Sequence, residues 1–281
     1  VLCLLLNLAG CAAAQKPLRV TLVLKTVTEV AEFWGTLLSG VEKAAEEYGV
    51  GLKVLTSPRE IDIDKQIELI RQVTADKPDV MILSAADYDR CAEATEEAIA
   101  AGIGVVAIDT DVNAAGRACF VGSNSYEIGL EMGAMASYLP EGGKVAVIQH
   151  MLTTTTGIER TRGVLDALNE AGNIEILGSF CCDNSTEQAQ TITTELLSAD
   201  PEIRGFVCTN EVCNVGAANA LVELGMGGRV YVVGCDNSQR QIQFLEQNII
   251  QAIVTQRPFN MGYVAVQQAV RVANGEQTDD F

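Results

Sequence analysis

The sequence contains an internal repeat: the segment 19–111 matches the segment 144–238 in pattern and in order. In each copy an apolar, β-branched segment comes first, and a later apolar segment ends in an aspartate, Asp109 in the first copy and Asp236 in the second. Each copy is about as long as a small domain. The repeat therefore predicts two similar units in succession.

Short apolar runs alternate with amphipathic stretches through both copies. Runs of the kind seen at 18–24, 79–83 and 104–108 are typical of strands buried on both faces of a parallel sheet. Apolar residues at three- and four-residue spacing within 34–48 and 63–73 predict helices that cover such a sheet. The second copy has corresponding strand-like runs at 144–148, 205–208 and 229–233. The fold class is therefore α/β, with two doubly wound, Rossmann-like lobes.

Polar residues follow the predicted strands at their carboxyl ends, the edge at which open parallel sheets bind ligands. If the two lobes face each other, these residues converge on one cleft. The first lobe would contribute Lys25, Asp109 and Thr110, and the second would contribute His150, Asn210 and Asp236. We therefore expect a single ligand bound between two lobes.

The residue types near this cleft suit a ligand that carries several hydroxyl groups. Carboxylates accept hydrogen bonds from adjacent hydroxyls, amides donate and accept, and an aromatic face packs on the C–H side of a sugar ring. The candidate residues are Phe33, Trp34, Asp109, Asn124, Arg160, Asn210, Asp236 and Gln256.

Other roles are open for some of these residues. Trp34 lies on the apolar stripe of its helix and could belong to the core. Asp109 could cap a following segment, and Asp236 could cap the helix that begins near Gln239. Arg160 could be an exposed helix charge or a partner of Glu159 or Asp166.

The charge and the composition exclude several classes of function. With 19 basic and 37 acidic residues, the chain lacks the cations that a nucleic-acid surface needs. His150 is the single histidine, which argues against a zinc site or a Ser/His/Asp hydrolase. Nine cysteines at irregular spacing indicate no disulfide framework and no metal site. Asp109 and Asp236 could imitate the two carboxylates of a glycosidase, but we expect a binding protein without enzymatic activity, cofactor or metal.

The N-terminus has the pattern of a bacterial lipoprotein signal, although a buried N-terminal strand or helix is the alternative. An apolar stretch ends in Leu8-Ala9-Gly10-Cys11, which is similar to a lipobox. We therefore expect residues 1–11 to form a signal peptide ending at the lipidation site Cys11, and residues 12–17 to form a tether. Such a protein is exported and anchored to the outer face of the cytoplasmic membrane by its lipid alone.

Several short motifs resemble those of periplasmic sugar-binding proteins of the ribose-binding type, the solute-binding components of ABC transporters. The matching segments are Phe33-Trp34, Ala107–Asp109, Val121–Asn124, Arg160–Gly163, Thr209–Glu211, Val232–Asp236 and Thr255–Pro258. The resemblance implies the type 1 periplasmic binding protein fold. It also implies that the aromatic pair stacks on the sugar ring. The residues implied to hydrogen-bond the sugar hydroxyls are Asp109, Arg160, Asn210, Asp236 and Gln256.

The sequence departs from the ribose-binding pattern in ways that concern the ligand. Asp109-Thr110-Asp111 stands where that pattern has Asp-Arg, and the second-lobe aromatic is replaced near Asn184. An Asn-rich approach to the aromatic pair is replaced by residues 28–32. These departures argue against ribose itself. Lys25, which we include among the ligand-binding residues, is similar to a feature of relatives that bind the autoinducer-2 signal or other atypical sugars.

The resemblance also implies the division of the chain and its action. Residues 18–122 and 257–281 would form the N-terminal lobe and residues 123–256 the C-terminal lobe. A third crossing and a final strand, about 10 to 30 residues in all, would follow Phe281. A monomer would capture a monosaccharide or polyol by hinge closure and deliver it to an ABC permease. The alternative is a sensor of a sugar or of an autoinducer-2-like signal for a chemoreceptor or histidine kinase. A transcription regulator of the same fold would have a helix-turn-helix where this chain has a lipobox.

Overall fold

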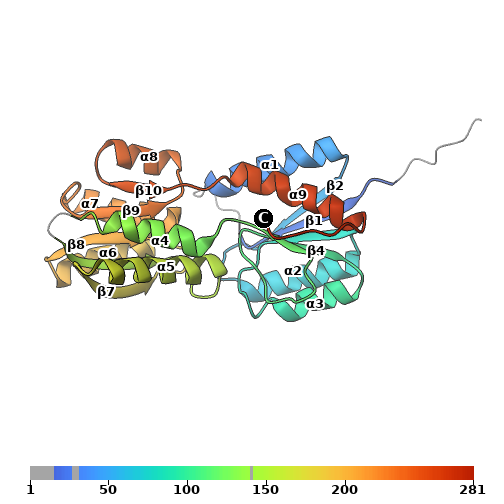
Figure 1. Cartoon of the computed structure of the whole chain (residues 1–281), viewed down its shortest axis with the longest axis horizontal. Helices are drawn as coiled ribbons and strands as arrows, with labels where there is room; N and C mark the ends of the chain where they lie inside the picture. Colours follow the sequence, from blue (N-terminus) through green and yellow to red (C-terminus); the bar gives the residue numbers. More distant parts are fainter. Residues whose placement is uncertain (1–15, 27–31, 140–141) are drawn as a thin grey trace, which may run out of the picture.

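The computed structural model describes residues 16–26, 32–139 and 142–281, and it consists of two α/β lobes that lie side by side (Figure 1). Each lobe is built on a five-stranded sheet, and all its strand pairs are parallel. This architecture confirms the predicted fold class. The proposed signal peptide with Cys11 and most of the tether lie outside the described residues.

The first lobe has strand order β2-β1-β3-β4-β5. Its strands are β1 (Arg19–Leu24), β2 (Gly51–Thr56), β3 (Val80–Leu83), β4 (Gly104–Ile108) and β5 (Cys119–Val121). Helices α1 (Glu32–Tyr48) and α9 (Pro258–Ala273) cover one face, and α2 (Ile63–Asp76) and α3 (Ala92–Ala100) cover the other. Helix α9 is late in the sequence, yet its apolar side chains share a core with α1 and β1.

The second lobe repeats this arrangement, with strand order β10-β9-β8-β6-β7. Its strands are β6 (Gly143–Gln149), β7 (Ile174–Cys181), β8 (Ile203–Cys208), β9 (Tyr231–Cys235) and β10 (Ala252–Val254). Helices α4 (Ser125–Ala136) and α5 (Thr155–Ala171) pack on one face. On the other face lie α6 (Thr186–Ala199), α7 (Glu211–Glu223) and α8 (Gln239–Glu246).

The six strands predicted from continuous apolar runs are confirmed, with ends that differ by up to two residues. The four strands that this pattern missed, β2, β5, β7 and β10, are the edge strands of the two sheets. An edge strand is covered less completely, and β2, for example, is largely exposed. Its sequence therefore lacks the continuous apolar run that marks a central strand.

The helices of the second lobe begin at side chains that cap them. Asn124, Thr154, Ser185, Asn210 and Ser238 each accept a hydrogen bond from the backbone N–H three residues later. Such a cap is worth about 0.5–2 kcal/mol, because it satisfies a helix N–H that has no partner inside the helix. These five positions therefore fix where the helices start relative to the sheet edge.

Glycines allow the helices α1 and α9 to pack closely. A Cβ atom on Gly262 would lie 2.1 Å from the carbonyl oxygen of Leu37, and one on Gly40 would lie 2.0 Å from that of Phe259. Neither distance is compatible with a side chain, so the backbones meet directly. Among the described residues, no helix is long and apolar enough to span a membrane.

Candidate ligand-binding site

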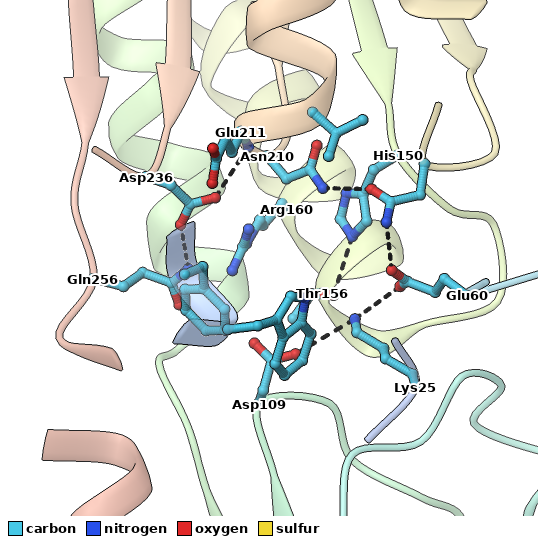
Figure 2. Close-up of a pocket in the computed structure, with 14 residues that line it drawn as sticks. Lys25, Glu60, Asp109, His150, Thr156, Arg160, Asn210, Glu211, Asp236 and Gln256 are labelled. Atoms are coloured by element: carbon cyan, nitrogen blue, oxygen red, sulfur yellow. Dashed lines mark hydrogen bonds and ion pairs between the residues drawn. The ribbon is translucent and has the colours of Figure 1, made fainter. Parts of the chain in front are cut away.

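A cavity of about 410 Å³ lies between the two lobes, at the carboxyl ends of both sheets (Figure 2). Its lining combines charged, amide and aromatic side chains with one aliphatic residue. The lining residues are Lys25, Phe33, Trp34, Glu60, Asp109, His150, Thr156, Arg160, Asn184, Asn210, Glu211, Val212, Asp236 and Gln256.

On the first-lobe side, Lys25 forms two ion pairs. Its Nζ atom is 2.8 Å from Glu60 Oε1 and 3.4 Å from Asp109 Oδ2, and the three side chains are almost completely buried. Nζ also lies over the ring of Trp34, 5.7 Å from the centroid. Burial lowers the pKa of Lys25, but the ion pairs with Glu60 and Asp109 outweigh burial, so the net pKa is raised. Lys25 is therefore a fixed cation.

Asp109 and Asp236 follow β4 and β9 and occupy equivalent backbone positions. Both have left-handed backbone conformations, with φ of 61° and 76°. Asp236 accepts hydrogen bonds from Gln256 Nε2 at 2.8 Å and from the backbone N–H of Glu211 at 3.0 Å. The cap of α8 is Ser238, so the alternative in which Asp236 caps that helix is wrong.

Arg160 points from α5 into the cavity and is 3% exposed (Figure 2). Its NH1 group donates to the Thr209 carbonyl at 2.9 Å, and its Nε has no hydrogen-bond partner among the described residues. Glu159 pairs with Arg162, and Asp166 accepts from Tyr126, so neither carboxylate is the partner of Arg160. The guanidinium thus has donor capacity left for a ligand.

His150 follows β6 and is held between two hydroxyl groups. Nδ1 is 2.7 Å from Thr209 Oγ1 and Nε2 is 3.2 Å from Thr156 Oγ1. Burial, and then the charges of Lys25 and Arg160, lower the pKa of His150 well below its ordinary value. The imidazole is therefore neutral.

A chain of side-chain hydrogen bonds crosses from one lobe to the other. Asn184, which follows β7, donates from Nδ2 to Glu60 Oε2 at 2.7 Å, and Asn210 Nδ2 donates to Asn184 Oδ1 at 2.8 Å. Elsewhere between the lobes, the backbone N–H of Gln239 donates to Glu32 at 3.2 Å. The lobes are thus in contact around the cavity, in a closed arrangement.

Eight of the nine ligand-binding residues predicted from the sequence line the cavity. The exception is Asn124, which is exposed and accepts a hydrogen bond from the Glu127 backbone as the cap of α4. Capping places its side chain on the helix end, outside the described cavity lining. Thr110 also lies outside the cavity lining, since its hydroxyl is buried against Ser84 and the Ala85 carbonyl.

Sequence reasoning gave no role at the site to several cavity residues. Glu60 follows an edge strand that the apolar pattern missed, and Thr156 and Val212 lie in the first turns of helices. Glu211 belonged to a matched motif, which was the available signal for it. In the described part of the chain, no three His, Cys, Asp or Glu side chains lie together as metal ligands.

The sequence is similar to a known protein family and to several characterised proteins. The sequence pattern of the periplasmic binding protein domain family matches residues 21–277. The chain is 26% identical to the D-allose-binding periplasmic protein of Escherichia coli, with 92% of this chain and 84% of that protein covered. It is 24% identical to the ribose import binding protein of Bacillus subtilis, covering 87% and 79%.

Solved structures show the same fold. The crystal structure of a sugar transporter from Clostridium phytofermentans has a TM-score of 0.85 and 30% identity, with 92% of this chain and 94% of that chain covered. A carbohydrate transporter solute-binding protein from Agrobacterium radiobacter, in complex with D-arabinose, has a TM-score of 0.89 at 23% identity, with 95% and 92% covered.

Proposed function

The chain belongs to the periplasmic binding protein family, and from this premise we propose that it captures a monosaccharide or sugar-like polyol outside the cytoplasm and delivers it to an ABC permease. The names of its relatives, which include binding proteins for D-allose and ribose, support this function. The observation that carries the proposal is the cavity itself, because both lobes surround it with carboxylates, amides and a guanidinium.

The aromatic pair supplies the apolar part of the site. Phe33 and Trp34 both line the cavity, with ring centroids 5.1 Å apart and planes at 89°. Trp34 is 5% exposed and packs in the core of the first lobe, whereas Phe33 is only partly buried. Phe33 is therefore our candidate for stacking on the C–H face of a sugar ring, with Trp34 holding it in place.

Closure of the two lobes is the mechanism that we propose for capture. A ligand that contacts Asp109 in one lobe and Asp236 in the other makes both sets of contacts only when the lobes are together. Binding then shifts the population toward the closed state by the difference in affinity for the two states. The hydrogen bond between Asn184 and Glu60 would add to the stability of this closed state.

Binding without chemical conversion is the activity that the site supports best. Asp109 is paired with Lys25, and Asp236 accepts hydrogen bonds from Gln256 and from the Glu211 backbone. Both carboxylates are thus engaged as acceptors of ion-pair or hydrogen-bond contacts from the protein. A glycosidase acid would instead need a proton to donate.

The proposal includes a monomer, anchored through a lipid on Cys11 to the outer face of the cytoplasmic membrane. The lipobox motif supports the anchor, and the periplasmic location named for relatives supports export. Sensing of a sugar for a chemoreceptor or histidine kinase is the second candidate function, because a closed lobe pair can be recognised by either kind of partner.

The experiment is a thermal-shift screen of the purified protein against pentoses, hexoses, deoxy-sugars, polyols and autoinducer-2. A ligand present at 100 times its Kd stabilises the folded state by about 2.7 kcal/mol, which raises the melting temperature measurably. The absence of a shift with every compound would contradict the proposal.

Calorimetry with the ligand found in that screen then tests the site. Asp236→Ala removes a carboxylate from the cavity, and truncation of one buried hydrogen-bonded charge costs about 2–5 kcal/mol of binding. Asp279→Ala, which changes an exposed carboxylate, is the matched control and should leave the Kd unchanged. An unchanged Kd for Asp236→Ala would show that Asp236 does not bind the ligand.

A further inference from the structure

The cavity contains more buried carboxylates than cations. Its described lining includes four carboxylates, those of Glu60, Asp109, Glu211 and Asp236, each at most 7% exposed. The cations among the same lining residues are Lys25 and Arg160, and His150 is neutral. If all four carboxylates are ionised, the site therefore has an excess of two negative charges.

Three of the four carboxylates have partners in the structure. Glu60 and Asp109 pair with Lys25, and Asp236 accepts from Gln256 and from a backbone N–H. Glu211 differs from them, because the Ser238 side chain and the Glu32 backbone hydrogen-bond its carboxylate but no described cation pairs with it. It is 3% exposed, and its Oε2 atom has no hydrogen-bond partner among the described residues.

Glu211 lies where the cavity meets a second pocket. It is the first residue of α7, and Figure 2 shows it beside Asp236, across the drawn cavity from Lys25. Both carboxylates also line a neighbouring pocket of about 650 Å³, to which Glu32 and Ser238 contribute. Glu211 and Asp236 thus lie at the end of the site away from Lys25, and Glu32 lines the adjoining pocket with them.

A buried carboxylate that has no cation and one oxygen without a hydrogen-bond partner is unfavourable when ionised, and two solutions are available. Glu211 can take up a proton, and burial together with repulsion from Asp236 does raise its pKa to about 7. Alternatively, the ligand can bring a positive charge that pairs with the ionised carboxylate. A protonated amine is suited to this position because it donates up to three charge-assisted hydrogen bonds.

We propose that the ligand is a sugar that carries a protonated amino group, bound by Glu211 and Asp236, while its hydroxyl groups contact the rest of the cavity. This inference rests on the proposed function, since it names the class of sugar for the same site. The excess of buried carboxylates and the unpartnered Glu211 oxygen are the observations that carry it. A neutral sugar would leave that oxygen either protonated or without a cation.

The test compares amino sugars with the parent sugars that have a hydroxyl in place of the amine. Titration calorimetry at pH 7 would use 2-amino and 6-amino derivatives of glucose and galactose, together with glucose and galactose. We expect at least one amino sugar to bind about tenfold or more tightly than its parent. The inference is overturned if no amino sugar binds more tightly than its parent.

Substitutions then locate the amine. In Glu211→Gln the preference for the amino sugar should disappear while the parent sugar still binds, and Glu211→Asp, which keeps the charge, should retain part of the preference. Glu223→Gln, at the exposed end of the same helix, is the matched control and should keep all of it. A preference that survives in Glu211→Gln would overturn the assignment. If Glu211→Gln does not fold, the wild-type comparison and the Glu211→Asp variant still test whether Glu211 binds the amine.

The outcomes separate this inference from the function on which it rests. Binding of neutral sugars without any preference for amines overturns the inference and supports capture of a neutral sugar. If neither kind of sugar binds, both the inference and the proposed function are overturned.

Discussion

The hydrogen bond between Asn184 and Glu60 should contribute to ligand affinity, because it joins the two lobes beside the cavity. We would test it with Glu60→Gln, Asn184→Gly and the double variant. Glycine is the appropriate replacement at 184, since Asn184 has a φ of 54°, a left-handed conformation that alanine adopts poorly. This double-mutant cycle is needed to isolate the Asn184–Glu60 contact, because Glu60 also pairs with Lys25 and Asn184 also accepts a hydrogen bond from Asn210.

The magnitude follows from the geometry. The donor and acceptor atoms are 2.7 Å apart and the acceptor is a buried carboxylate. Hydrogen bonds to charged groups are worth about 1.5–3 kcal/mol net. Because the contact exists only when the lobes meet, this coupling energy should appear in ligand binding, where it corresponds to a factor of about 10 to 150 in Kd.

The assay is titration calorimetry with the ligand identified by the thermal-shift screen, and the melting temperature of each ligand-free variant shows whether it is folded. Asn248→Gly is the matched control, because Asn248 is also in the second lobe with a φ of 56° but does not line the cavity. Paired with Glu60→Gln, it should give additive effects. Additivity within about 0.5 kcal/mol for the Glu60→Gln and Asn184→Gly pair would refute the reasoning.

Three further predictions concern packing, protonation and stacking. Gly262→Ala should lower the free energy of unfolding by about 1–3 kcal/mol, measured by urea denaturation, because the added Cβ would lie 2.1 Å from the Leu37 carbonyl oxygen. Glu211→Gln should make the melting temperature fall more steeply with acidification below pH 6.5. The pKa of Glu211 is raised from 4.5 to about 7, so this residue contributes stability that is complete below pH 4.5 and is lost as pH rises toward 7. The pKa of His150 is lowered, so the histidine contributes stability that is present above pH 6.5 and is lost as pH falls. If the melting temperature of Glu211→Gln depended on pH in the same way as that of the wild type, Glu211 would not oppose His150 in this manner. Phe33→Ala should weaken sugar binding by about 0.5–1.5 kcal/mol or more in calorimetry, while an equal Kd would show that the ring does not stack on the ligand.

The sequence by itself determined the plan of the molecule. The repeat predicted two lobes, and the six central strands were visible because a strand buried on both faces must be apolar along its whole length. The same repeat placed Asp109 and Asp236 at equivalent strand ends, and both indeed line one cavity. Pattern alone was sufficient there, because the carboxyl ends of parallel strands share one edge.

Edge strands and helix ends were harder to predict, because an edge strand is only partly buried and a polar residue at a helix end can have more than one role. The exposed strand β2 has no continuous apolar run, so the pattern did not reveal it, nor Glu60 in the loop that follows it. Asn124 belongs to a residue type that can cap a helix or bind a ligand, and the sequence does not distinguish the two roles. The structure shows the cap.

The tertiary structure alone decided which side chains of the site contact one another. Lys25, Glu60 and Asn184 are far apart in the sequence, yet they form a continuous set of contacts across two lobes. It also decided that Gln256 and the Glu211 backbone hold Asp236, while one oxygen of Glu211 is buried without a partner in the described chain. Charge balance and burial depend on which side chains meet when the lobes close, and that is a property of the folded arrangement rather than of any single segment.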